Sequence, residues 1–108
     1  MLTLLDQLAN AKTTEQAIFL LGQHYKITDK IKNSIEFATK AHEGQTRKSG
    51  EPYVVHPILV SAIVAAIGGD ETMIIASILH DVVEDTPRTL EEVQFFFDSD
   101  VASLVDGL

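Results

Sequence analysis

Apolar residues recur at helical spacing over nearly the whole chain, and no segment alternates apolar and polar residues for the length of a useful strand. The helical segments are separated by capping residues, glycine and proline, which are ordinary helix start and stop signals. A chain of 108 residues has room for one domain, and its hydrophobic fraction of 45% supports a modest core. The sequence therefore predicts an all-α fold, a compact multi-helix bundle.

The expected helices are short, and one long loop rich in glycine, proline and charge interrupts them over residues 44–55. We expect a helix near residues 2–9, a second from a cap at Thr14 to 22–24, and a third from a cap at Thr28 or Asp29 to about His42. A fourth covers 57–67, and a fifth runs from a cap at Asp70 to Thr86. A sixth runs from a cap at Thr89 through 95–97, and a last segment over 101–105 is opened by Asp98 or Asp100. Pro57 suits the first turn of its helix because that turn does not use the missing N–H.

Charge is unevenly distributed in this chain, whose formal net charge is −8. After Ser49 only Arg88 opposes eleven carboxylates. Such a field repels polyanions, so we expect no nucleic-acid binding. The chain has no cysteine, which excludes disulfides and thiolate ligands. It also has no apolar run of the roughly 18 residues that a membrane span needs and no secretory signal, so we expect a cytoplasmic protein with no membrane partner.

A histidine and an aspartate stand side by side in an apolar helical stretch, at His80 and Asp81. Together they can offer one imidazole nitrogen and one carboxylate oxygen to a metal, and His56 can add a second imidazole from another helix. Borderline divalent ions accept this mixture of donors. The alternative is a partly exposed pair at the end of the helix, with Asp81 bonded to another side chain.

Two further carboxylates follow within one helical turn. Glu84 lies four residues after His80, and Asp85 lies four residues after Asp81, so each pair shares a helix face. These groups can hold a cation, and a carboxylate that does not ligate it can accept a proton from water as a general base. The alternative is a frayed helix end in solvent, although carboxylates there oppose the helix dipole.

The long loop carries three candidate substrate-binding residues, Arg47, Lys48 and Ser49. A guanidinium can clamp a phosphate or stack on a base, and an ammonium can pair with an oxyanion. The alternative is an ordinary solvated basic turn. Tyr53 is expected to pack the loop down, and His42 is interpreted as a structural histidine on the apolar face of its helix.

Four strings taken together, AHEGQTRKSGEPYVVHP, ASILHDVVEDT, TLEEV and VASLVDGL, strongly resemble the N-terminal hydrolase domain of RelA/SpoT-type alarmone enzymes. These enzymes belong to the wider HD-domain superfamily of metal phosphohydrolases. The resemblance covers residues 28–108, which would form the N-terminal portion of an HD-type domain, and residues 1–27 resemble its helical lead-in. It implies that the bundle is of the HD-domain type.

The resemblance also implies a reaction, namely Mn²⁺-dependent hydrolysis of guanosine 3′,5′-bis(diphosphate) (ppGpp), or its pentaphosphate form, to GDP or GTP plus pyrophosphate. It implies metal ligation by His56, His80 and Asp81, orientation or activation of water by Glu84 and Asp85, and nucleotide contact by Arg47, Lys48 and Ser49.

One departure from the family pattern concerns the fourth metal ligand, an aspartate in a later string similar to LADRLHNMRT, which these 108 residues do not contain. We therefore expect alarmone hydrolysis from a parent protein, in which a C-terminal synthetase domain is a possible partner, and an inactive fragment here. Two alternatives remain. One is another HD-type nucleotide phosphohydrolase, and the other is a non-catalytic helical module that regulates a neighbouring synthetase domain.

Overall fold

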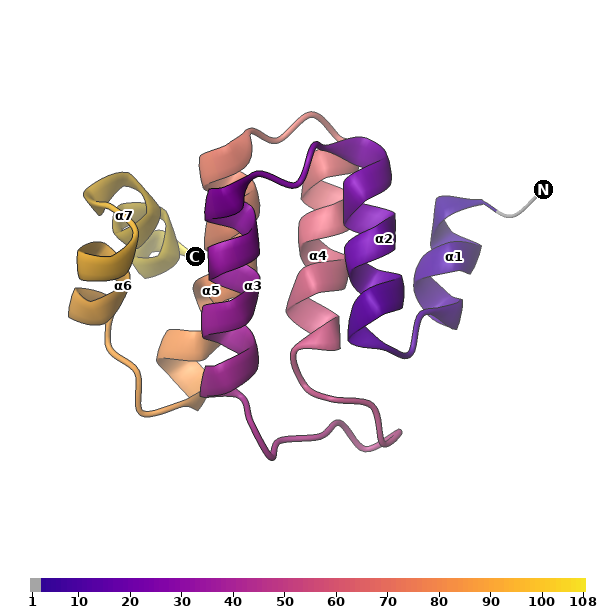
Figure 1. The fold of residues 1–108 in the computed structure, drawn as a ribbon, viewed down its shortest axis with the longest axis horizontal. Helices are drawn as coiled ribbons and strands as arrows, with labels where there is room; N and C mark the ends of the chain where they lie inside the picture. The colour runs from indigo at the N-terminus through magenta and orange to yellow at the C-terminus, as the bar shows by residue number, and fades with distance from the viewer. Residues whose placement is uncertain (1–2) are drawn as a thin grey trace.

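The computed structural model describes residues 3–108, and this part of the chain is folded into helices without a strand. In order along the chain, the helices are α1 (Leu4–Asn10), α2 (Thr14–His24), α3 (Asp29–Ala41), α4 (Val55–Ala66), α5 (Glu71–Asp85), α6 (Leu90–Phe96) and α7 (Ser99–Gly107). Figure 1 shows them joined by short connections, except for the long loop between α3 and α4. The all-α prediction is confirmed.

The helix starts follow from local hydrogen bonding. The cap of α2 is Thr13, and the predicted cap at Thr14 is wrong, because only Thr13 forms a reciprocal capping box with the side chain of Gln16. Of the two residues predicted to open the last helix, Asp98 is the cap of α7, which begins at Ser99, two residues before the predicted segment. The predicted caps at Asp70 and Thr89 are confirmed, and of the two alternatives for α3 the cap is Thr28, while Asp29 is the first residue of the helix. The predicted helix start at residue 2 lies outside the described residues.

The start of α4 differs slightly from the prediction. The helix begins at Val55, without a side-chain cap, and Pro57 occupies its first turn, where its missing N–H breaks no intrahelical bond. Its end matches the predicted stop: Gly68 has a φ of +96°, and a Cβ on Gly69 would lie 2.8 Å from the carbonyl oxygen of Val64. Two successive glycines thus allow the chain to reverse at once into α5.

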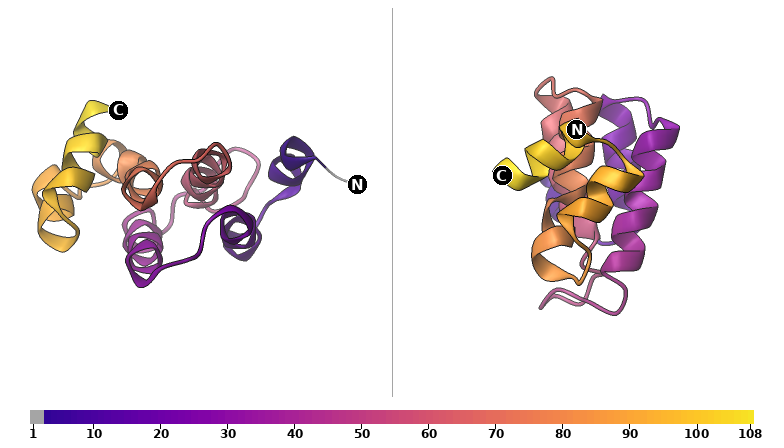
Figure 2. Two further views of the ribbon diagram at one scale, coloured as in Figure 1. Left: turned by 90° about the horizontal axis from the view of Figure 1, so that it is seen from above. Right: turned by 90° about the vertical axis from the view of Figure 1, so that its left-hand side faces the viewer.

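The middle of the molecule is a bundle of α2, α3, α4 and α5, and the short helices flank it. Figure 2 shows α1 at one end of this bundle and the α6–α7 pair at the other. Helix α5 packs against α3, α4 and α7. Its fully buried residues are Ile74, Ile75, Ile78, Leu79 and Val82. Each such side chain stabilises the fold by about 1.5–3 kcal/mol relative to exposure, so α5 is a rigid support for polar groups on its remaining face.

Within residues 3–108, no helix is both long and apolar enough to cross a lipid bilayer.

Candidate metal centre and catalytic site

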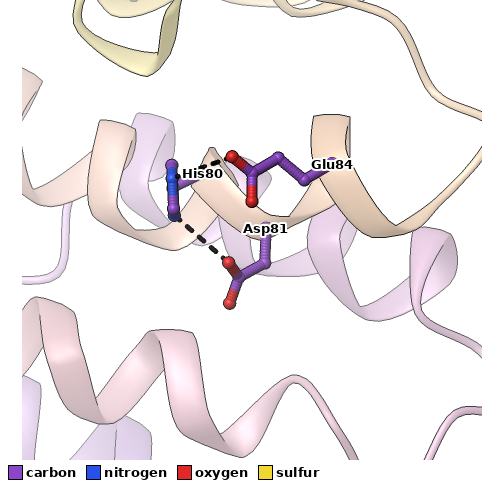
Figure 3. Close-up of side chains that lie close together, drawn as sticks. All are labelled: His80, Asp81 and Glu84. Atoms are coloured by element: carbon purple, nitrogen blue, oxygen red, sulfur yellow. Dashed lines mark ion pairs between the residues drawn. The ribbon is translucent and has the colours of Figure 1, made fainter. Parts of the chain in front are cut away.

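Three donor side chains converge on one face of α5, near its C-terminal end. The Nδ1 atom of His80 lies 3.1 Å from Oδ1 of Asp81, and its Nε2 atom lies 3.6 Å from Oε1 of Glu84. Figure 3 shows the two carboxylates approaching different nitrogens of the same ring. The predicted pairing of His80 with Glu84 across one helical turn is therefore present.

This cluster can hold a metal ion. One donor atom from each of His80, Asp81 and Glu84 lies within 4.8 Å of the others, which is close to the spacing of ligands around one ion. A nitrogen and two carboxylate oxygens form a donor set that suits a borderline or hard divalent cation. His80 and Asp81 are partly buried and held by α5, whereas the Glu84 side chain is 61% exposed and can reorient. Glu84 is thus the most mobile of the three donors.

Asp85 is held by two residues of the loop between α3 and α4. Its Oδ2 atom accepts a hydrogen bond from the Tyr53 hydroxyl at 2.8 Å, and its backbone carbonyl accepts one from Nε2 of Gln45 at 3.1 Å. The hydrogen bond to Asp85, burial and the nearby charge of Asp81 raise the pKa of Tyr53 to about 12. The phenol therefore stays protonated and donates to Asp85 at all physiological pH values.

The loop with the candidate substrate-binding residues is a narrow turn. The backbone N–H of Arg47 donates to the Glu51 carbonyl, and Gly50, with a φ of +98°, closes the tip by donating to the Arg47 carbonyl. Nε of Arg47 lies 4.0 Å from a Glu51 carboxylate oxygen. The Ser49 hydroxyl is the main cause of a lowered Glu51 pKa. Arg47, Lys48 and Ser49 thus lie at an exposed tip, where an anionic group can reach them.

The structure does not place His56 in the cluster on α5. His56 is partly buried in the first turn of α4 and lines a pocket of about 220 Å³ with Arg47, Glu51 and Lys12. His80 and Glu84 line another pocket, together with Asp106. Figure 1 shows the start of α4 and the end of α5 at the same end of the bundle. Convergence of His56 with His80 and Asp81 therefore stays a prediction.

Sequence reasoning missed the polar contacts of Gln45 and assigned Tyr53 only a packing role. Both residues donate a hydrogen bond to Asp85, which lies 32 or more positions further along the chain. Local sequence patterns do not predict contacts over such a separation. The sequence did contain one hint of their role, because Gln45 and Tyr53 flank the three candidate substrate-binding residues of the loop. His42 is buried, as expected of a structural histidine, but its Nε2 atom has no hydrogen-bond partner within residues 3–108.

The sequence profile of the family described as "HD domain" matches residues 34–108 of this chain. The chain belongs to the HD domain family. The match begins inside α3 and includes both α4 and α5, so it covers every candidate site residue described above. The predicted membership of the HD domain family is therefore confirmed, as is the predicted all-α fold.

Curated relatives carry the names of alarmone enzymes. The chain is 41% identical over 104 residues to the bifunctional (p)ppGpp synthase/hydrolase SpoT of Escherichia coli, an alignment that covers 96% of this chain and 13% of that protein. It is 50% identical over 72 residues to a probable guanosine-3′,5′-bis(diphosphate) 3′-pyrophosphohydrolase of Synechocystis, covering 67% of this chain and 10% of the relative. It is also 49% identical over 80 residues to a GTP pyrophosphokinase of Myxococcus xanthus, an alignment that covers 74% of this chain and 11% of that protein. The chain thus spans only about a tenth of the length of these relatives.

Proposed function

We propose that this chain belongs to a metal-dependent hydrolase of guanosine 3′,5′-bis(diphosphate), to which it contributes the donor cluster on α5. The observation that carries the proposal is the convergence of His80, Asp81 and Glu84 within 4.8 Å, in a chain of the HD domain family. The names of the relatives support the substrate, because two of them are hydrolases of this nucleotide or its pentaphosphate form. The proposed domain division, with residues 1–27 as a lead-in, is supported by a family match that begins at residue 34.

We propose His80 and Asp81 as ligands of the metal, with His56 as a third ligand supplied by α4. Mn²⁺ is the proposed ion because the resemblance to RelA/SpoT-type hydrolases implies it, and the mixed imidazole and carboxylate donors suit a divalent cation in general. When bound, the metal would polarise the 3′-phosphate and compensate the negative charge that develops as water attacks. The residues of this chain supply the remaining steps.

Glu84 and Asp85 handle the water in this mechanism. The water oxygen attacks the phosphorus attached to the 3′ oxygen, and the bond between that phosphorus and the 3′ oxygen breaks. The 3′ oxygen is the leaving group and takes up a proton to become the hydroxyl of GDP or GTP, while the attacked diphosphate, now carrying the water oxygen, is released as pyrophosphate. A carboxylate takes the proton of the attacking water. Asp85 has its Oδ2 engaged by Tyr53, whereas its Oδ1 accepts no side-chain hydrogen bond within the described residues 3–108 and can accept a proton. Glu84 lies beside His80 and is exposed, so it can reach a water bound at the cluster.

The loop supplies nucleotide contacts in the same proposal. Arg47 can stack on the base or pair with a phosphate, whereas Lys48 and Ser49 donate to phosphate oxygens. The charge of the chain fits this division, because Arg47 and Lys48 lie just before the part of the chain in which only Arg88 opposes eleven carboxylates. A compact nucleotide with a metal is favoured over a long nucleic acid. Such a substrate also agrees with the expected cytoplasmic location.

A second candidate function is a regulatory one. One relative is named a GTP pyrophosphokinase and another a bifunctional synthase/hydrolase, which favours a protein with an additional synthetase domain. In such a protein this chain can act as a helical module that controls synthesis without hydrolysing the nucleotide itself. Because the chain retains His56, His80 and Asp81 and both acidic residues, Glu84 and Asp85, hydrolysis is the proposal that we favour.

The proposal is tested by pyrophosphate release from guanosine 3′,5′-bis(diphosphate) in the presence of Mn²⁺. The assay uses the longest available protein that contains this chain, with Glu84→Gln as a matched variant of the same size that cannot accept a proton. We expect Mn²⁺-dependent release in the wild type and its loss in the variant. GTP and other nucleoside polyphosphates serve as competing substrates. Release from these at an equal rate would point to a different HD-type phosphohydrolase, and no release from any would favour the regulatory function.

A further inference from the structure

The loop between α3 and α4 is tied at two points to the last residue of α5. The Tyr53 hydroxyl donates to the Asp85 carboxylate at 2.8 Å, and the Gln45 side-chain amide donates to the Asp85 backbone carbonyl at 3.1 Å. The last carbonyls of a helix have no intrahelical donor, so this amide satisfies a group that otherwise needs water. One residue is thus held through both its side chain and its backbone.

A buried histidine supports both of these contacts. The Nδ1 atom of His42 lies 3.1 Å from Oε1 of Gln45. Because the Gln45 amide nitrogen donates to Asp85, its oxygen faces His42, and His42 must carry its proton on Nδ1. The His42 ring also packs on the Tyr53 ring, with centroids 4.7 Å apart and planes 32° apart. His42 is only 2% exposed, so both partners rest on a fixed surface. We call His42, Gln45 and Tyr53 the loop clamp.

The loop clamp brackets the proposed substrate-binding residues. The backbone N–H of Tyr53 donates to the Gln45 carbonyl at 3.0 Å, which closes the base of the loop. Residues 47–49 form the tip between these two positions. Gln45 and Tyr53 thus close the base of the loop through their backbones and contact Asp85, a proposed water-handling carboxylate, through their side chains.

We propose that Gln45 and Tyr53, supported by His42, are positioning residues that hold the loop tip and the Asp85 carboxylate in a fixed relation. The catalytic part of this inference rests on the proposed hydrolase function. Tyr53 acts through Asp85: its hydroxyl occupies Oδ2 and limits rotation of the carboxylate, which leaves Oδ1 directed at water. A fixed carboxylate is worth more in the transition state than one that samples several rotamers.

The kinetic test uses Tyr53→Phe, which removes one hydroxyl and keeps the ring that packs on His42. We expect kcat for the bis(diphosphate) to fall about tenfold, with KM changed less than about twofold, because the lost contact orients the water-handling group rather than the nucleotide. The matched control is Tyr25→Phe at the end of α2, the same chemical change outside the site, which should leave kcat and KM unchanged. Gln45→Glu keeps the acceptor for His42 but removes the donor to the Asp85 carbonyl, and it should lower kcat in the same way.

A second readout needs no activity. Hydrogen exchange of the Arg47, Gly50 and Tyr53 amides, all bonded within the loop, should become several-fold faster in Tyr53→Phe and stay unchanged in Tyr25→Phe. If the wild-type protein does not hydrolyse the nucleotide, the proposed function fails, and the exchange rates alone decide whether the loop clamp holds the loop. Unchanged exchange in Tyr53→Phe would overturn the clamp. Faster exchange with wild-type kcat, or with a change in KM alone, would overturn its role in positioning Asp85.

Discussion

Replacing Asp85 by Asn should lower the pKa of Tyr53 measurably. In the wild type this pKa is about 12, against an ordinary value of 10.0, and the hydrogen bond to the Asp85 carboxylate is its largest cause. The amide of Asn can accept from the neutral phenol and can also donate to the phenolate, so it no longer favours the protonated form. Burial and the charge of Asp81 remain, and we therefore expect a fall of about one pH unit rather than a return to 10.0.

The same shift predicts how stability depends on pH. Between pH 10.0 and about 12 the folded chain holds the Tyr53 proton and the unfolded chain does not, so the free energy of unfolding falls as pH rises through this window. Two pH units correspond to at most about 2.7 kcal/mol, and screening at this partly exposed site reduces the contribution to about 1 kcal/mol. Asp85→Asn should make the fall shallower.

Ionisation of Tyr53 is measured by tyrosine ring carbon NMR or by ultraviolet absorbance, in a Tyr25→Phe background that leaves Tyr53 as the remaining tyrosine of two. Urea unfolding at several pH values gives the stability curve. A Tyr53 pKa that stays near 12 in Asp85→Asn would show that burial and the charge of Asp81, and not the Asp85 carboxylate, hold the proton. That result would refute the assigned contact between the loop and α5.

Four further results are expected. His80→Ala should weaken Mn²⁺ binding more than about tenfold, as calorimetry would show, because it removes the one imidazole of the cluster. Glu84→Gln should abolish turnover while Mn²⁺ affinity changes little, and Arg47→Ala should raise KM about tenfold with kcat retained. Gly69→Ala should lower stability by about 1–3 kcal/mol in urea unfolding, because its Cβ would lie 2.8 Å from a backbone oxygen of α4. Gly107→Ala, whose Cβ meets nothing within 4 Å, should have little effect.

Much of the local structure was predictable from short-range patterns. Capping residues act within three positions of a helix start, which is why the sequence predicts the caps at Asp70 and Thr89 and narrows the cap of α3 to Thr28 or Asp29. Thr13 was missed because two threonines stand together, and only the reciprocal bond with Gln16 distinguishes them. The sequence thus predicted that a threonine caps α2, but not which of the two neighbouring threonines it is.

The sequence by itself determined that Glu84 lies beside His80 on α5, because residues four positions apart on a helix are neighbours whatever surrounds them. That the Asp81 carboxylate also turns toward the His80 ring was decided by the structure. Only the tertiary structure decided that Asp85, on the same turn, bonds to Tyr53 instead. It also decided that His56 lines a pocket with Arg47. Contacts within a helix depend on a fixed local geometry, whereas contacts between a loop and a distant helix end depend on how the whole bundle packs.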